Sequence, residues 1–430
     1  MSQADLTIRA LRAGDDLDAD RDLLHRAFGP MPVAEPGDLL GERLDCIAQS
    51  RLFGAWDGKD QVGTARFHDM RQWWYGRSVP MAGVGGVAVA PEARGRGIGK
   101  ALMTALLGAM AERGYPISVL YPATTRLYRS LGWELAGGYY RAELPGRSLS
   151  SLLPADPAAA APRDAGGGSA GAAGVGAGDA GVRGSGSPAL RRVCHADADE
   201  IIAVLGTIYA GGMDCGPCTT DPASVRRWLL GRETFAYLAP DGFLAYSWHG
   251  SSHEIMVHVL QAASAGTVSA LWGIVGSHAA LAKRVRACVG PSDPITWLTR
   301  EPDVSLSRNE TWMLRLLDAR AAIEGRGFPA DARVRLALAL TDPQLPANAG
   351  LHTLTVADGA GSLIRSETGS TAQSPAAPPV RLGPRGFAAL FAGVPMATLR
   401  RAGLAAGGDG TADAALDCAF AAQPYLLDYF

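Results

Sequence analysis

Residues 83–110 read GVGGVAVAPEARGRGIGKALMTALLGAM and hold seven glycines and four charged residues within and between two apolar runs. The first apolar run predicts a strand at 84–90, and the glycine-rich segment predicts a turn at 91–97. Residues 98–112 predict a helix that Gly114 ends, because apolar side chains recur on one face: Ile98, Leu102, Ala105, Leu106 and Ala109. A strand, a glycine-rich turn and a helix therefore follow one another here.

Such a turn is suited to binding a phosphate or pyrophosphate group. Its free backbone amides and those of the first helical turn point into one small space, where the helix dipole favours negative charge. Glycines let the backbone approach a ligand closely, and Arg94, Arg96 and Lys100 add positive charge. From these residues alone, an ordinary solvated turn is an equally good interpretation.

Two well-known glycine-rich motifs do not fit this segment. A Walker-type P-loop would end in Gly-Lys-Ser/Thr, and residues 97–102 read GIGKAL. A dinucleotide-binding fold places its glycine-rich turn after the first strand, whereas this turn comes about 80 residues into the chain.

The chain of 430 residues is long enough for two to four domains. Residues 156–188 have almost no bulky apolar side chain and predict a flexible Gly/Ala-rich linker. A weaker boundary near Pro302 then gives three units, at 1–150, 189–303 and 304–430, with an exposed low-complexity loop at 366–379. In the first unit, a helix at 16–28 and strands at 51–56, 62–68 and 117–121 predict an α/β layer arrangement.

Composition restricts the partners and the compartment. A formal net charge of −2 provides no electrostatic footprint for nucleic acid. The N-terminal residues are acidic where a signal peptide would be basic and apolar, and there is no uninterrupted apolar run of about 18 residues. We therefore expect a cytoplasmic protein with neither a nucleic-acid nor a membrane partner.

The cysteine and histidine patterns do not predict a metal site or a redox centre. Cys215 and Cys218 have the spacing of a redox dithiol, but no strand-like alternation precedes them, so a loop with two thiols is the favoured interpretation. No second Cys or His pair lies at zinc-ligand spacing. The histidines of HEIMVH at 253–258 are five residues apart, not four as in a metalloprotease helix, so this segment predicts a strand. We expect no metal cofactor.

Several segments together carry a resemblance to a known family. VAVAPEARGRGIGKALM at 87–103 resembles the coenzyme A pyrophosphate motif of the GCN5-related N-acetyltransferase (GNAT) superfamily, and RGYPISVLYPATTRLYRSLGWELA at 113–136 resembles its enhanced intracellular survival (Eis) branch. Residues 234–248 look like a strand-turn-strand of a second GNAT-like domain. Residues 311–328 and 386–405 resemble a sterol-carrier-protein-like third domain. The resemblance implies an α/β (α+β) chain of two GNAT-like domains followed by a sterol-carrier-like domain.

The resemblance further implies acetyl transfer from acetyl-CoA to a primary amine. Backbone groups of Val87, Ala88 and Val89 would hold the pantetheine arm, Tyr128 would protonate the departing thiolate, and the C-terminal carboxylate of Phe430 would act as the base. The turn matching the pyrophosphate site consists of Arg94, Gly95, Arg96, Gly97, Ile98, Gly99 and Lys100. Without the resemblance, Tyr128 would be read as a half-buried packing residue and Phe430 as a frayed terminus. Because residues 419–430 are apolar and aromatic, we expect them to dock.

The acceptor is left open by departures from the family pattern. Gly86 stands where an aromatic residue can occur, Ala123 stands where a serine can contact coenzyme A, and the side-chain acid nearest the end is Asp428. An aminoglycoside and another polyamine are both candidate acceptors, and related proteins imply a hexamer. Two alternatives remain, namely a coenzyme A-binding sensor without turnover and a lipid-binding protein.

Overall fold

The structure is a computed structural model that describes residues 6–29, 36–152, 188–231, 233–249, 253–366 and 378–428. It divides into two compact units, of which the first contains residues 1–140, 209–227 and 307–430, and the second contains residues 141–208 and 228–306. Nearly all of the predicted linker at 156–188 and of the predicted loop at 366–379 lies outside the described residues. The domain boundaries at 150, 189 and 304 stay predictions.

A sheet forms the centre of the N-terminal part of the first unit. Along this part of the sheet the strands are, in spatial order, β1 (Leu6–Ala10), β2 (Leu52–Asp57), β3 (Asp60–Trp74), β4 (Arg77–Val89), β5 (Ile117–Leu120), β13 (Ser305–Leu316) and β6 (Glu134–Pro145). Strands β3 and β4 extend well beyond the predicted ranges, because a tight turn at Tyr75 and Gly76, both at positive φ, folds them into one long hairpin. The other predicted strands of this region are confirmed.

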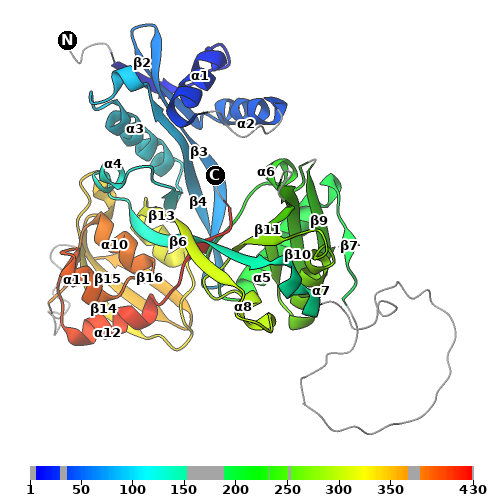
Figure 1. The fold of residues 1–430 in the computed structure, drawn as a ribbon. Helices are drawn as coiled ribbons and strands as arrows, with labels where there is room; N and C mark the ends of the chain where they lie inside the picture. Colours follow the sequence, from blue (N-terminus) through cyan, green and yellow to red (C-terminus); the bar gives the residue numbers. More distant parts are fainter. Residues whose placement is uncertain are drawn as a thin grey trace, which may run out of the picture. The chain divides into compact units, whose positions relative to one another are not determined.

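Two of the helices beside this sheet, α1 and α3, occupy the predicted ranges. Helix α1 (Leu17–Phe28) begins after Asp16, whose side chain accepts from the amides of Asp18 and Ala19. Helix α3 (Ile98–Glu112) buries its apolar face against β3 and β4 (Figure 1). Helices α2 (Pro36–Ala48) and α4 (Thr125–Arg129) complete this part. Within the described residues, no helix has both the length and the apolar character needed to cross a membrane.

The second unit has its own strands and helices. The predicted strand-turn-strand at 234–248 is the antiparallel pair β9 (Thr234–Ala239) and β10 (Gly242–His249). Strand β10 is followed by β11 (Glu254–Ala262), and α7 (Ala265–Gly276) connects β11 to the parallel strand β12 (Arg284–Val289). The HEIMVH segment is therefore a strand, as predicted, and His258 on it lies 2.8 Å from the Ser247 hydroxyl.

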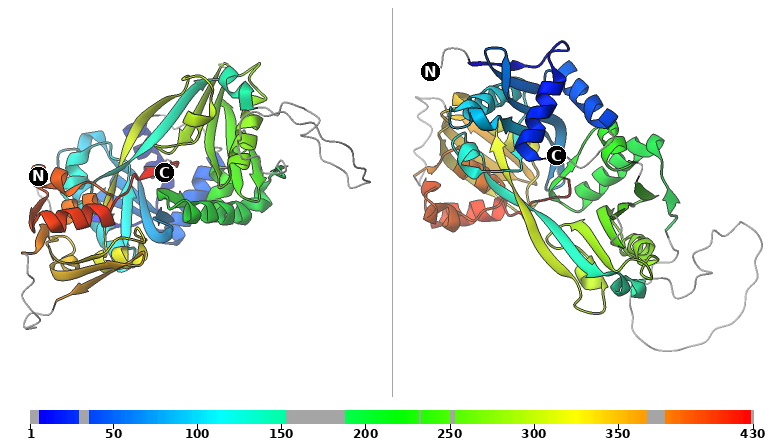
Figure 2. Two further views of the ribbon diagram at one scale, coloured as in Figure 1. Left: turned by 90° about the horizontal axis from the view of Figure 1, so that it is seen from below. Right: turned by 45° about the horizontal axis from the view of Figure 1, so that its top comes forward.

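The C-terminal part of the first unit has a five-stranded sheet. Its order is β16 (Ala360–Arg365), β15 (Gly350–Ala357), β14 (Val334–Leu340), β17 (Val380–Leu382) and β18 (Ala405–Gly407). Helix α9 (Ala319–Gly325) leads into it. The orange-to-red helices lie together beside the sheet in both figures (Figures 1 and 2): α10 (Pro384–Phe391), α11 (Met396–Arg401) and α12 (Gly410–Ala419).

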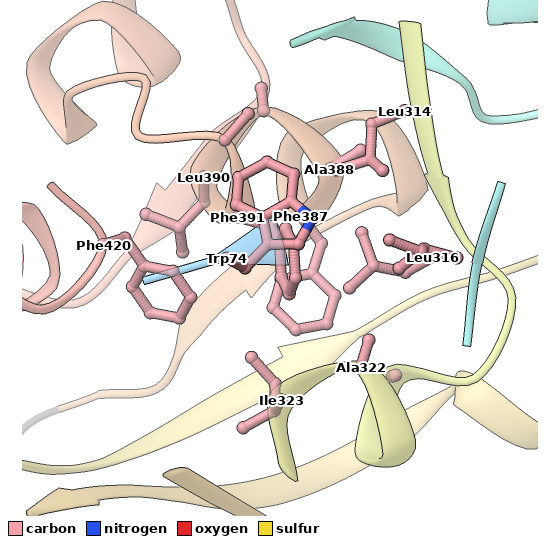
Figure 3. Close-up of a cluster of buried hydrophobic side chains, with 14 of the residues drawn as sticks. Trp74, Leu314, Leu316, Ala322, Ile323, Phe387, Ala388, Leu390, Phe391 and Phe420 are labelled. Atoms are coloured by element: carbon pink, nitrogen blue, oxygen red, sulfur yellow. The ribbon is translucent and has the colours of Figure 1, made fainter. Parts of the chain in front are cut away.

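Side chains fill the interior of this C-terminal part. Trp74 at the end of β3 packs against Phe391, in the same buried cluster as Phe420 (Figure 3). The guanidinium of Arg326, which is fully buried, lies 4.5–5.5 Å from the ring centres of these three residues and of Phe328. Burial lowers its pKa to about 10, so the group is still a cation at neutral pH. The four aromatic rings thus enclose the buried cation within the interior of this part.

Candidate active site

Strands β4 and β5 pair over only part of their length. Their parallel register runs from Met81 opposite Ile117 to Val84 opposite Leu120, where β5 ends. Strand β4 continues to Val89 and is paired there with β3 alone. One edge of its last residues is therefore open.

The open edge carries backbone hydrogen-bonding groups. The amide of Ala90 donates to Val62 on the β3 side at 2.9 Å, so by alternation the amides of Val87 and Val89 point to the other side, where β5 has ended. A β-bulge at Gly86, with φ +61°, precedes them and bends the strand at this point. The glycine that departs from the family pattern thus occupies a backbone conformation that an aromatic residue would rarely adopt.

The predicted anion-binding turn directly follows this edge. Gly95 and Gly97 both have positive φ, +80° and +81°, and no side chain caps the N-terminus of α3. The amides of the first turn of α3 are therefore available to a ligand, with the positive end of the helix dipole behind them.

The charged side chains of the turn differ in how they are held. Arg94 is exposed, and its Nε donates to the Val89 carbonyl at 3.3 Å, so it lies between the turn and the open edge. Arg96 instead forms an ion pair of 2.7 Å with Asp57. Lys100 is exposed on the first turn of α3.

Tyr128 is held in the apolar cluster beneath the open edge. It is 5% exposed on α4 and packs in the cluster that contains Val84 and Leu120, the last residues that pair β4 with β5. Among the described residues, its hydroxyl has no hydrogen-bond partner. Burial raises the pKa of Tyr128 to about 12, so the hydroxyl keeps its proton at neutral pH.

The C-terminal tail docks into the same domain. Strand β19 (Tyr425–Leu426) pairs in parallel with Gly138 and Tyr139 of β6 (Glu134–Pro145). The hydroxyl of Tyr121, the residue after β5, donates to the Asp428 carbonyl at 2.8 Å. The tail thus reaches the end of β5, where the edge of β4 becomes open, and the expectation that it docks is confirmed as far as Asp428. Phe430 lies outside the described residues.

Two glycines make room for the tail. A Cβ atom on Gly137 would lie 2.4 Å from the Pro424 carbonyl oxygen, and one on Gly216 would lie 2.2 Å from that of Tyr425. The Tyr425 hydroxyl also donates to the Asp214 carboxylate at 2.7 Å. The tail backbone therefore passes in contact with β6 on one side and with the segment around Gly216 on the other.

The prediction of a loop around Cys215 and Cys218 was wrong. These residues belong to strand β8 (Cys215–Thr219), which pairs with the far end of β3. Both thiols are free and buried, and burial raises the pKa of each, that of Cys218 well above its ordinary value. A raised pKa keeps a thiol protonated and unreactive, so the pair lacks the chemistry of a redox dithiol.

Asp428 adds an acid beside the end of the tail. Its carboxyl group lies near the buried side chains of Tyr209 and Cys218. Burial raises the pKa of this carboxyl group to about 6. The group is thus mainly ionised at neutral pH and protonated in mild acid.

Comparison with known proteins identifies the family. Residues 7–136 and 224–316 match two families, each described as an acetyltransferase (GNAT) domain, and residues 319–427 match the sterol carrier protein domain. A solved GCN5-related N-acetyltransferase from Kribbella flavida is 37% identical to this chain and superposes on it with a TM-score of 0.85. The match covers 99% of this chain and 98% of the Kribbella chain. The chain belongs to the GCN5-related N-acetyltransferases. The predicted fold class, two GNAT domains followed by a sterol-carrier-like domain, is confirmed.

More distant members of the superfamily include the Eis proteins. The N-acetyltransferase Eis of Mycobacterium tuberculosis is 28% identical over 293 residues, which is 64% of this chain and 65% of that protein. The chain therefore spans somewhat less than two thirds of the length of these curated relatives. Eis1 from Mycobacterium abscessus, at 21% identity and a TM-score of 0.71, covers 99% of this chain and shares its fold.

For this GCN5-related N-acetyltransferase, the structure brings most predicted site residues together. The open edge at Val87, Ala88 and Val89, the turn from Arg94 to Lys100 and the cluster around Tyr128 lie on consecutive elements of one sheet layer. Sequence reasoning missed the residues that hold the tail: Tyr121, Gly137, Asp214 and Gly216. No local pattern marks them, because each acts through a contact with a segment at least 200 residues away in the chain.

Proposed function

We propose that the chain transfers an acetyl group from acetyl-CoA to a primary amine of a small molecule. The observation that carries this proposal is the open edge of β4 at Val87 and Val89, followed directly by the uncapped N-terminus of α3. An extended thioester arm can bind along such an edge while its pyrophosphate binds the helix terminus. Acetyl transfer requires that acetyl-CoA contacts the β4 edge and the N-terminus of α3 at the same time.

In the proposed reaction, the amine nitrogen attacks the thioester carbonyl carbon and the C–S bond then breaks. Backbone amides on the β4 edge stabilise the developing oxyanion. The protonated Tyr128 hydroxyl donates to the departing sulfur. The terminal carboxylate of Phe430 takes the proton that the amine loses, and an α-carboxyl group, with an ordinary pKa of about 3.5, is ionised at neutral pH.

The proposed function is tested with acetyl-CoA and four probe amines: an aminoglycoside, spermidine, a lysine peptide and an arylamine. We expect thiol release and an acetylated product with at least one of them, and the aminoglycoside and spermidine are the favoured acceptors. Calorimetric binding of acetyl-CoA without thiol release with any amine would instead favour the non-catalytic sensor.

Arg94→Ala should weaken acetyl-CoA binding with little effect on the chemical step. A charge-assisted contact is worth about 1.5–3 kcal/mol, so we expect KM for acetyl-CoA to rise about tenfold or more and kcat to change little. Steady-state kinetics at varied acetyl-CoA concentration measures both constants. Arg320→Ala, which removes an exposed arginine paired with Glu324, is the control and should leave KM unchanged. An unchanged KM for acetyl-CoA in Arg94→Ala would show that this arginine does not contribute to acetyl-CoA binding.

A further inference from the structure

The short helix α4 carries Tyr128 and has little stability of its own. It has only five residues, Thr125–Arg129, and the turn that follows leads to Trp133. A helix of this length is marginal in water, so neighbouring contacts must hold it in place. The position of the Tyr128 hydroxyl therefore depends on what contacts α4 and its turn.

The first such contact is an ion-pair bridge through Glu134. This residue is 4% exposed, and its Oε1 accepts from Arg129, the last residue of α4, at 2.7 Å. Its Oε2 accepts from the Nε of Arg385, at the start of α10, also at 2.7 Å. Glu134 thus connects the C-terminal end of α4 to the sterol-carrier-like domain.

The second contact lies two residues further along the chain, at Leu131. Arg315, 1% exposed, donates to the Leu131 carbonyl at 3.1 Å and binds both carboxylate oxygens of Asp342 at 2.6 and 2.7 Å. Gly132, with φ +93°, allows this approach, because a Cβ atom there would lie 2.8 Å from both Arg315 Nε and Pro384 Cβ. Charge-assisted bonds in a buried setting are strong and directional.

We propose that the sterol-carrier-like domain fixes the position of Tyr128 through these two bridges, with Arg385 and Glu134 as positioning residues. The proposal rests on the proposed role of Tyr128 in acetyl transfer. Both bridges act just after Tyr128, at residues 129 and 131. Their far ends, Arg385 and Asp342, lie in the sterol-carrier-like domain, and Arg315 of β13 connects Asp342 to residue 131. A small displacement of α4 would move the hydroxyl away from the sulfur, and misplacement of a catalytic group by about 1 Å can cost about 10²-fold in rate.

The test is a double-mutant cycle between Arg385→Gln and Tyr128→Phe. It measures single-turnover acetyl transfer from acetyl-CoA to whichever of the four probe amines reacts fastest. We expect Arg385→Gln to slow transfer about tenfold with an unchanged Kd for acetyl-CoA, and to cause no further loss when Tyr128 is already phenylalanine. Arg385→Lys should recover part of the rate. Hydrogen exchange of residues 125–133 should be faster in Arg385→Gln whether or not an amine acceptor is found.

A matched control separates positioning from general stability. Asp413→Asn breaks a partly buried ion pair with Arg400 in the same domain, without a contact to α4, and should leave the transfer rate unchanged. An equal loss from Arg385→Gln in both backgrounds, or unchanged hydrogen exchange, would overturn the proposal. If Tyr128→Phe alone has no effect on the transfer rate, the result contradicts the proposed role of Tyr128 as proton donor. It does not contradict the contact between α4 and the sterol-carrier-like domain, which hydrogen exchange tests separately. Glu134→Gln is a second variant that breaks the same bridge and should behave like Arg385→Gln.

Discussion

Tyr128→Phe is expected to slow the chemical step by about 100-fold or more, with unchanged affinity for acetyl-CoA. The substitution removes only the hydroxyl that donates to the departing sulfur and keeps the ring that packs in the apolar cluster. Single-turnover transfer measures the rate, and calorimetry measures the affinity. Because the pKa of Tyr128 is about 12, the wild-type rate should show no loss from its ionisation up to about pH 10.

Tyr115→Phe is the control for this substitution. Tyr115 packs against the same cluster, and its pKa is also raised to about 12, chiefly by burial. The structure gives Tyr115 no part in the site, so its substitution should leave the rate within about twofold of wild type. Equal rates for Tyr128→Phe and wild type with a good amine acceptor would exclude the proposed proton donor.

A few residues added after Phe430 should abolish transfer and leave acetyl-CoA binding intact. An extension converts the free carboxylate of Phe430 into a peptide group, which cannot act as the base, whereas the edge and turn proposed to bind acetyl-CoA come from residues 87–100. Calorimetry and the transfer assay together measure the two effects. Full activity of the extended chain would exclude the terminal carboxylate as the base.

Gly216→Ala tests whether transfer depends on the path of the C-terminal tail, and it leaves all residues of the tail unchanged. Its Cβ atom would lie 2.2 Å from the Tyr425 carbonyl oxygen, so the tail must shift, and we expect a loss on the order of 10²-fold in transfer. Gly403→Ala is the matched control, because Gly403 also has positive φ (+69°, against +105° at Gly216) but a Cβ atom there has no neighbour within 4 Å. Comparable rates for the two variants would show that the tail need not follow its present path.

Local pattern was sufficient for the elements that are proposed to bind the cofactor. The apolar face of residues 98–112 and the glycines at 95 and 97 are local signals, and they predicted α3 and its turn within a residue of the observed bounds. The prediction failed at Cys215 and Cys218, where two preceding glycines and the lack of strand-like alternation indicated a loop. Long-range pairing with β3 makes this segment a strand, and such pairing overrides local propensity.

The sequence by itself determined the α/β layers, the glycine-rich turn before α3 and the family resemblance, because all of these depend on the spacing of neighbouring residues. Only the tertiary structure decided where β5 stops beside β4, which glycines the tail passes and how Arg385 reaches α4 through Glu134. These features join segments far apart in the chain, such as Gly216 and Tyr425. Their contacts arise from packing and backbone pairing, which leave no periodic trace in the sequence.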